Sequence, residues 1–168
     1  GTWRDLITLV ADDEFTTESN SEAYHTQDTE ELSKYHIPAN FNLSKIYLME
    51  YPFDFKHEKP QAEEAIINAF NSGAVIINYM GHGNPDVWAH EKVFKRSQDI
   101  PRLNNQRKLP LVYTSSCSIG LFFNPTSEGM AEELLRAEDK GSIATISATW
   151  LVYPDPNAAL NFKVYDLL

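Results

Sequence analysis

Short apolar runs alternate along the chain with longer segments whose apolar positions recur at helical spacing. Strands are predicted over 5–11, 44–51, 74–80, 109–117 and 141–149. The third run, AVIINYM, starts with continuous apolar residues, which is typical of a central strand covered on both faces. Strands that alternate with helices favour βα units. The pattern therefore predicts an α/β protein with a mainly parallel sheet flanked by helices.

The helical segments have recognisable starts and ends. A helix is predicted over 58–73, with Gly73 as its end signal. A second helix is expected to begin near Thr126 and Ser127, whose hydroxyls suit the N-cap position. A third is predicted over 156–168. With the strands, these helices complete a set of βα units.

Length and composition fit one domain. The chain has 168 residues, of which 42% are hydrophobic, and this supports a single compact core. We expect one catalytic domain over 1–168, excised from a longer protein. The 24 acidic residues outnumber the 14 basic ones and give a net charge of -10, which argues against nucleic acid as a partner. No apolar run approaches the roughly 20 residues of a membrane helix, so membrane insertion by this fragment is not expected.

An acidic segment and a single cysteine stand out in the sequence. Nine acidic residues and no basic ones lie between positions 5 and 33, and the simplest interpretation is a solvated loop. Cys117 is the only cysteine, so an internal disulfide and a multi-cysteine metal site are excluded. Its thiol is either a small buried group or a reactive one.

His82 and Cys117 are each expected just past the carboxyl end of a central strand. Ligands of open α/β sheets bind at this edge, so the two side chains are expected to face one site. An imidazole there can accept the thiol proton and generate the nucleophilic thiolate. The main-chain N–H groups of Gly83 and Cys117 are candidates for stabilising an oxyanion. Packing and turn roles remain the simpler alternatives for each residue alone.

Other catalytic motifs fit the sequence poorly. HEKVF, at 90–94, starts like a zinc-binding helix but has Phe94 where the second histidine is required. The phosphatase arginine is missing after Cys117, where Phe123 stands instead, and no Gly-x-Ser-x-Gly elbow is present. A cysteine with a histidine is the remaining arrangement.

Three segments together resemble the gingipain-type cysteine peptidases: AVIINYMGHGNPDVWAHEKVF, LPLVYTSSCSIGLFFNPTSEGMAEELL and GSIATISATWLVYPDPNAALNF. Within that family they look closest to the sortase catalytic domains of the bacterial type IX secretion system. The resemblance implies a caspase-like three-layer fold. It also implies that Cys117 is the nucleophile and His82 the general base and acid, with Gly83 and Cys117 forming the oxyanion hole.

Further roles follow only from the resemblance. Gingipains place an acid near the catalytic histidine, and Asp13 is the expected match, with Asp12 as the alternative. Glu22 is the nearest match to a second acid in the substrate pocket. Trp88 matches a pocket-wall tryptophan, although ordinary packing explains it equally well. No cofactor is expected to be required, and the acidic loops permit calcium without an EF-hand spacing.

The sortase resemblance implies a specific biological reaction. Such an enzyme removes C-terminal signals from secreted cargo at the outer membrane surface and transfers the acyl group to a lipopolysaccharide amine or to water. Its partners are the polypeptide substrate and other secretion-system proteins. One alternative is a catalytically inactive gingipain-like domain that binds secretion partners. Another is a hydrolase that uses a serine beside Cys117.

Overall fold

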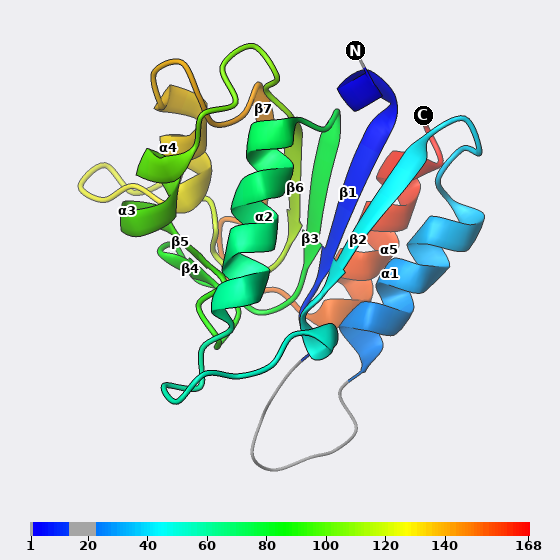
Figure 1. Ribbon diagram of the computed structural model, residues 1–168, viewed down its shortest axis with the longest axis horizontal. Coiled ribbons are helices and arrows are strands. Elements are labelled where there is room, and N and C mark those ends of the chain that lie inside the picture. The colour runs from blue at the N-terminus through cyan, green and yellow to red at the C-terminus, as the bar shows by residue number, and fades with distance from the viewer. Residues whose placement is uncertain (1, 14–22) are drawn as a thin grey trace.

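The core of the fold is a five-stranded parallel sheet, which the computed structural model describes within residues 2–13 and 23–168 (Figure 1). The strands lie in the order β2-β1-β3-β6-β7, and every neighbouring pair is parallel. Their bounds are Leu6–Ala11 (β1), Asn42–Tyr47 (β2), Ile76–Met80 (β3), Leu111–Ser115 (β6) and Ala144–Ser147 (β7). The predicted α/β class with a mainly parallel sheet is confirmed.

Helices cover both faces of this sheet and create three layers (Figure 1). On one face lie α1 and α5, and on the other lie α2, α4 and the short elements β4, β5 and α3. Their bounds are Tyr24–Tyr35 (α1), Pro60–Ser72 (α2), Arg96–Asp99 (α3), Met130–Arg136 (α4), Pro154–Tyr165 (α5), Val87–Trp88 (β4) and Phe94–Lys95 (β5). Single 3-10 turns cover Thr2–Asp5, Leu48–Glu50 and Ile100–Arg102.

Each face of the sheet has its own apolar core. In β3, Ile77 and Tyr79 pack toward α2 and α4, whereas Ile76 and Met80 pack toward α1 and α5. All five residues of β3 are buried, as predicted for a central strand covered on both faces. The remaining polar side chain, Asn78, exchanges two hydrogen bonds with Asn161 of α5.

The start of α4 differs from its prediction. Gly129 is the N-cap, and its N–H donates to the Glu132 carboxylate at 3.2 Å. Thr126 instead forms a turn in which its N–H and hydroxyl both donate to Asn124. A Cβ at position 129 would lie 2.5 Å from the carbonyl oxygen of Ile119, so the chain needs glycine there.

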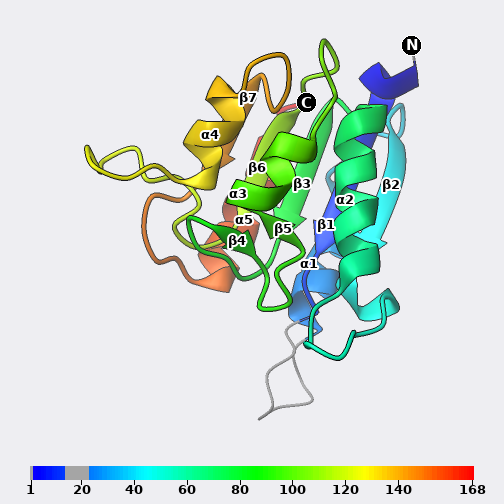
Figure 2. The same cartoon turned by 60° about the vertical axis from the view of Figure 1, so that its left-hand side comes forward.

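Two further parts of the fold were not predicted. The acidic segment was interpreted as a loop, which is wrong for residues 24–33, because α1 begins at Tyr24. The buried side chains of α1 are only His25, Thr29 and Leu32, which is too weak an apolar stripe to recognise. The β4–β5 hairpin and α3 lie beside α2, in a region for which no strand or helix was predicted (Figure 2). None of the described helices is long and apolar enough to cross a membrane.

Candidate active site

His82 and Cys117 lie together at the carboxyl edge of the sheet. Met80 at the end of β3 pairs with Ser115 at the end of β6, and each candidate residue follows two positions later. Both residues line one small cavity of about 60 Å³. The other lining residues are His25, Gly81, Ser115, Ser116, Val152, Tyr153, Pro154 and Asn157. Parallel pairing of neighbouring strands thus brings the predicted thiol and imidazole to the same site.

The Cys117 thiol faces the segment that follows β7. Its sulfur donates to the carbonyl oxygen of Val152 at 3.5 Å, and the side chain is partly exposed. The next residue, Ser118, donates its N–H to the carbonyl of Trp150 at 3.1 Å. These two contacts fix the Cys117 loop against the wall of the cavity while leaving the sulfur accessible.

The backbone of His82 is held from three directions. Its N–H donates to Asp12 Oδ2 at 2.9 Å. Its carbonyl accepts from the Tyr79 hydroxyl at 2.5 Å and from the Ala89 N–H at 2.8 Å. Because strand ends and a hairpin both anchor this turn, the position of the imidazole is set by the core of the fold.

Two other histidines flank the His82 ring. The His25 ring lies 5.6 Å away in an edge-on arrangement, and the His90 ring lies 4.9 Å away. His25 is only 5% exposed. Burial, and then the charge of His82, lower the pKa of His25 to about 3. A neutral imidazole from α1 therefore forms one wall of the cavity, a feature missed because α1 itself was not predicted.

Gly81 and Gly83 are required by close packing. Neither has a positive φ; the described glycines that do are Gly73 and Gly141. A Cβ at position 81 would lie 2.4 Å from the Asp12 Cβ, and one at position 83 would lie 2.6 Å from Ser116 Oγ. The close approach of neighbouring chain segments therefore explains both glycines.

The two predicted oxyanion donors are not used in other hydrogen bonds among the described residues. The N–H groups of Gly83 and Cys117 donate to no acceptor among the described residues. Unused donors beside a nucleophile are what an oxyanion hole requires. Their role stays a prediction.

The other predicted site residues do not line the small cavity, or they lie outside the described residues. Asp13 forms an ion pair with Lys59, and the acid that contacts His82 is Asp12. Trp88 is fully buried and stacks on Tyr79 with ring centroids 4.5 Å apart, so it packs in the core and does not line the cavity. Glu22 falls outside the described residues.

A second buried acid accompanies Asp12 and Asp13. Glu91, between β4 and β5, is 2% exposed. Burial, and then the charge of Asp12, raise its pKa to about 7. Glu91 could not be predicted from the sequence, because it reaches the end of β1 only through the packing of the hairpin.

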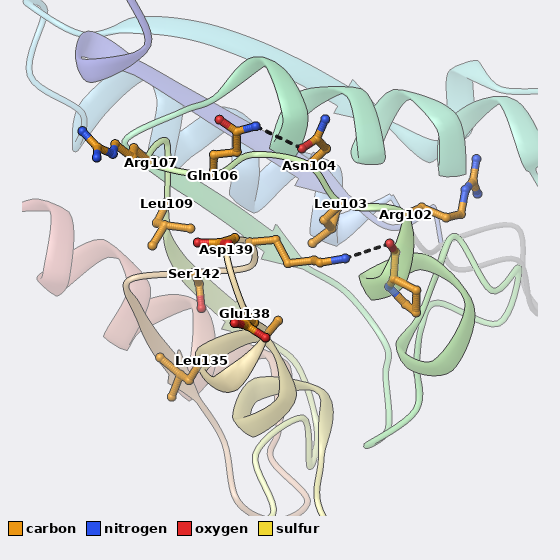
Figure 3. Close-up of a pocket in the computed structure, with 13 residues that line it drawn as sticks. Arg102, Leu103, Asn104, Gln106, Arg107, Leu109, Leu135, Glu138, Asp139 and Ser142 are labelled. Atoms are coloured by element: carbon orange, nitrogen blue, oxygen red, sulfur yellow. Dashed lines mark hydrogen bonds between the residues drawn. The ribbon is translucent and has the colours of Figure 1, made fainter.

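A larger cavity, of about 830 Å³, lies at the opposite edge of the sheet (Figure 3). Its lining comes from the segments that precede β6 and β7 and from the end of α4. Arg102 and Arg107 share this lining with Glu138 and Asp139. Its lining contains no cysteine or histidine, so the predicted pair of Cys117 and His82 belongs to the small cavity.

Comparison with known proteins agrees with this arrangement. Residues 1–168 match the family model "Peptidase family C25". The chain belongs to this family. As a C25 member it is 33% identical over 90 residues to gingipain R2 of Porphyromonas gingivalis, an alignment that covers 50% of this chain and 12% of gingipain R2. Gingipain R1 of the same species matches at 33% identity over 90 residues, with 50% and 9% covered.

Solved structures support the same fold for this C25 chain. The crystal structure of the Arg-specific cysteine proteinase gingipain R superimposes with a TM-score of 0.70 at 25% identity, over 94% of this chain and 34% of that one. A complex of the pro- and mature domains of P. gingivalis RgpB gives a TM-score of 0.73 at 22% identity, over 99% and 38%. The predicted caspase-like three-layer fold is confirmed. The chain spans about a third of these relatives' solved length.

Proposed function

We propose that this C25 domain is the catalytic domain of a cysteine peptidase, with Cys117 as nucleophile and His82 as general base and acid. The observation that carries the proposal is the shared cavity of the two side chains at the carboxyl ends of adjacent parallel strands. Family membership supports the same chemistry. The partial exposure of Cys117 leaves its sulfur within reach of a substrate.

The proposed reaction passes through a thioester on Cys117. His82 takes the thiol proton of Cys117, and the thiolate adds to the scissile carbonyl carbon. The Gly83 and Cys117 N–H groups stabilise the resulting oxyanion. When the tetrahedral intermediate collapses, the C–N bond breaks and His82 returns the proton to the leaving amine. Water or an amine then attacks the thioester, and the thiolate is released.

Exposed apolar residues beside the cavity support a polypeptide substrate. Tyr153 lines the cavity and is exposed, and the neighbouring Trp150 and Leu151 are exposed as well. Phe123 lies edge-on to Trp150 with ring centroids 5.7 Å apart. Adjacent apolar side chains on a surface are typical of a binding site for another chain. A substrate segment lying across them would pass directly over Cys117.

The rate of Cys117 alkylation tests the proposed dyad, because the chain contains no other cysteine. At neutral pH we expect Cys117 of the wild type to be alkylated faster than an ordinary free thiol, since His82 stabilises the thiolate. His82→Asn should reduce the alkylation rate to that of a free thiol. His57→Asn, a change at an exposed histidine outside the cavity, serves as the matched control. A free-thiol alkylation rate in the folded wild type, unchanged by His82→Asn, would refute the dyad.

The finer assignment is a type IX secretion sortase acting at the outer membrane surface. The resemblance of the three segments to sortase catalytic domains supports it, and a thioester on Cys117 serves an amine or water equally. Mass spectrometry of processed cargo distinguishes these acceptors: a sortase yields cargo conjugated to a lipopolysaccharide amine, whereas a simple peptidase yields a free carboxylate. Only free carboxylate products in the presence of the amine would contradict the sortase assignment.

A catalytically inactive binding module is the second candidate. The exposed apolar residues beside the cavity would then hold a secretion partner without cleaving it. Cys117→Ala separates the two functions, because it removes the nucleophile while leaving the surrounding surface intact. Loss of cargo processing with retained cargo binding supports the peptidase. Processing that continues unchanged in Cys117→Ala supports the binding module.

A further inference from the structure

The hydroxyl of Ser116 is buried beside the proposed nucleophile. Ser116 directly precedes Cys117, lines the small cavity and is 2% exposed. Its Oγ atom has no hydrogen-bond partner among the described residues. A buried hydroxyl without a partner destabilises a folded protein, and an alanine at the same position would avoid that cost. This hydroxyl is therefore suited to a partner that arrives with a substrate.

Close packing places the same hydroxyl against Gly83. A Cβ built on Gly83 would lie 2.6 Å from Ser116 Oγ, so only a glycine leaves room for this oxygen. The other predicted oxyanion donor, the Cys117 N–H, belongs to the residue that follows Ser116. Neither N–H donates to an acceptor in the part of the chain that the structure describes. Two main-chain donors and one hydroxyl thus lie close together at the cavity, all available to one acceptor.

We propose that the Ser116 hydroxyl is a third donor of the oxyanion hole, an inference that rests on the proposed peptidase function. When the Cys117 thiolate adds to a carbonyl carbon, an electron pair of the C=O bond moves to the oxygen and makes it an oxyanion. Ser116 donates a hydrogen bond to this oxyanion and keeps its proton throughout. Because a hydroxyl rotates about a single bond, it can meet the oxyanion without a change in the backbone.

Such a donor favours the tetrahedral oxyanion over the bound substrate. A hydrogen bond to a charged oxygen is roughly twice as strong as one to a neutral carbonyl. The buried position of Ser116 keeps bulk water from competing for the hydroxyl. The hydroxyl should therefore speed acylation of Cys117 without strengthening the binding of the substrate.

Two reagents that react with Cys117 in different ways test this role. p-Nitrophenyl acetate acetylates the thiolate through a tetrahedral oxyanion, and its C–O bond breaks to release p-nitrophenolate, which is measured by absorbance. Iodoacetamide alkylates the same sulfur at a saturated carbon, with loss of iodide and without an oxyanion. The ratio of the acetylation rate to the alkylation rate therefore separates oxyanion stabilisation from the reactivity of the thiolate.

Ser116→Ala should slow acetylation by roughly 10–100-fold, the loss expected for one hydrogen bond to a charged oxygen, and should leave alkylation unchanged. Its stability in urea should equal or exceed that of the wild type, because the change removes a buried hydroxyl without a partner. Ser116→Gly also lacks the hydroxyl and replaces Ser116→Ala if circular dichroism shows that the latter does not fold. A Gly83→Ala background is unsuitable for this comparison, because there Ser116→Ala also relieves a clash with the new Cβ.

Ser142→Ala is the matched control. Ser142 is also buried, and its hydroxyl likewise has no partner within residues 2–13 and 23–168. It lines the larger cavity at the opposite edge of the sheet (Figure 3). Removal of its hydroxyl should leave both the acetylation rate and the alkylation rate of Cys117 unchanged.

Three results would overturn the inference. Acetylation of Ser116→Ala at the wild-type rate would show that the hydroxyl does not act on the oxyanion. An equal loss of acetylation and alkylation would place the effect on the thiolate. An acetyl group located on Ser116 by mass spectrometry would make this residue a nucleophile. Failure of the proposed peptidase function looks different, because Cys117 would then be alkylated at the free-thiol rate, unchanged by His82→Asn.

Discussion

The carboxylate of Asp12 joins the end of β1 to the turn that carries His82, because its Oδ2 atom accepts the His82 N–H at 2.9 Å. Its Oδ1 atom accepts the Asp13 N–H at the same distance. The Asp12 side chain is fully buried, and both hydrogen bonds are partly buried. Asp12 thus positions His82 through the main chain, whichever acid contacts the imidazole.

Asp12→Ala should strongly destabilise the protein and slow Cys117 alkylation. It leaves two partly buried N–H groups without their charged acceptor, at a cost of roughly 2–5 kcal/mol in the free energy of unfolding. Asp12→Asn keeps one acceptor oxygen and should cost less. Urea denaturation measures the stability, and alkylation of the folded variants measures the effect on the dyad. An Asp12→Ala protein with wild-type stability would contradict this anchoring role.

Acid should destabilise the protein partly through His25. Its pKa is about 3 in the folded state, against an ordinary value near 6.5, so the unfolded chain binds a proton that the folded chain excludes. This contribution to stability is complete above about pH 6.5 and is lost as the pH falls toward 3, at up to roughly 1.4 kcal/mol per pH unit.

The His25→Gln variant isolates that contribution. Between pH 7 and pH 5, wild-type stability should fall by roughly 2 kcal/mol more than that of the variant. Urea denaturation at the two pH values measures this difference. The titration of all other groups cancels, because both proteins contain them. Parallel losses in the two proteins would show that His25 is protonated in the folded state.

Gly83→Ala should push the predicted oxyanion donor out of place. Its Cβ would meet Ser116 Oγ at 2.6 Å and Ile119 Cδ1 at 2.9 Å, a clash that typically costs about 1–3 kcal/mol. Acylation by a peptide substrate should slow as the N–H moves. Ser116→Ala removes the closer contact, so the double variant should regain part of both losses. A double-mutant cycle on stability and acylation rate tests this, and strictly additive effects would contradict it.

The elements that could be predicted from the sequence are strands with long apolar runs, because such a run is visible without knowing what packs against it. β3 is buried on both faces, and the continuous apolar residues at the start of this run indicate it directly. α1 has no such signal, because tertiary packing buries His25 and Thr29, polar residues that no periodicity marks. The two-residue strands β4 and β5 are too short to show alternation.

The candidate site was also predictable only in part. His82 and Cys117 were predictable because strand ends of a parallel sheet meet at one edge. Asp13 was the expected partner of His82, yet its neighbour Asp12 makes the described contact, since residues past a strand end no longer follow a fixed alternation. Glu91 comes close to Asp12 and Asp13 only through the β4–β5 hairpin, which the sequence did not reveal.

Trp88 should behave as a core residue and not as part of a substrate pocket. It is fully buried between Tyr79 and Phe94, with ring centroids 4.5 Å and 4.9 Å away. Trp88→Ala should therefore lower the free energy of unfolding by roughly 3–5 kcal/mol, and Trp88→Phe by less, because it keeps an aromatic ring on Tyr79. Since Trp88 does not line the cavity, the folded Trp88→Phe protein should keep its KM for a peptide substrate. A raised KM with unchanged stability would instead place this side chain in the substrate pocket, as the family resemblance suggested.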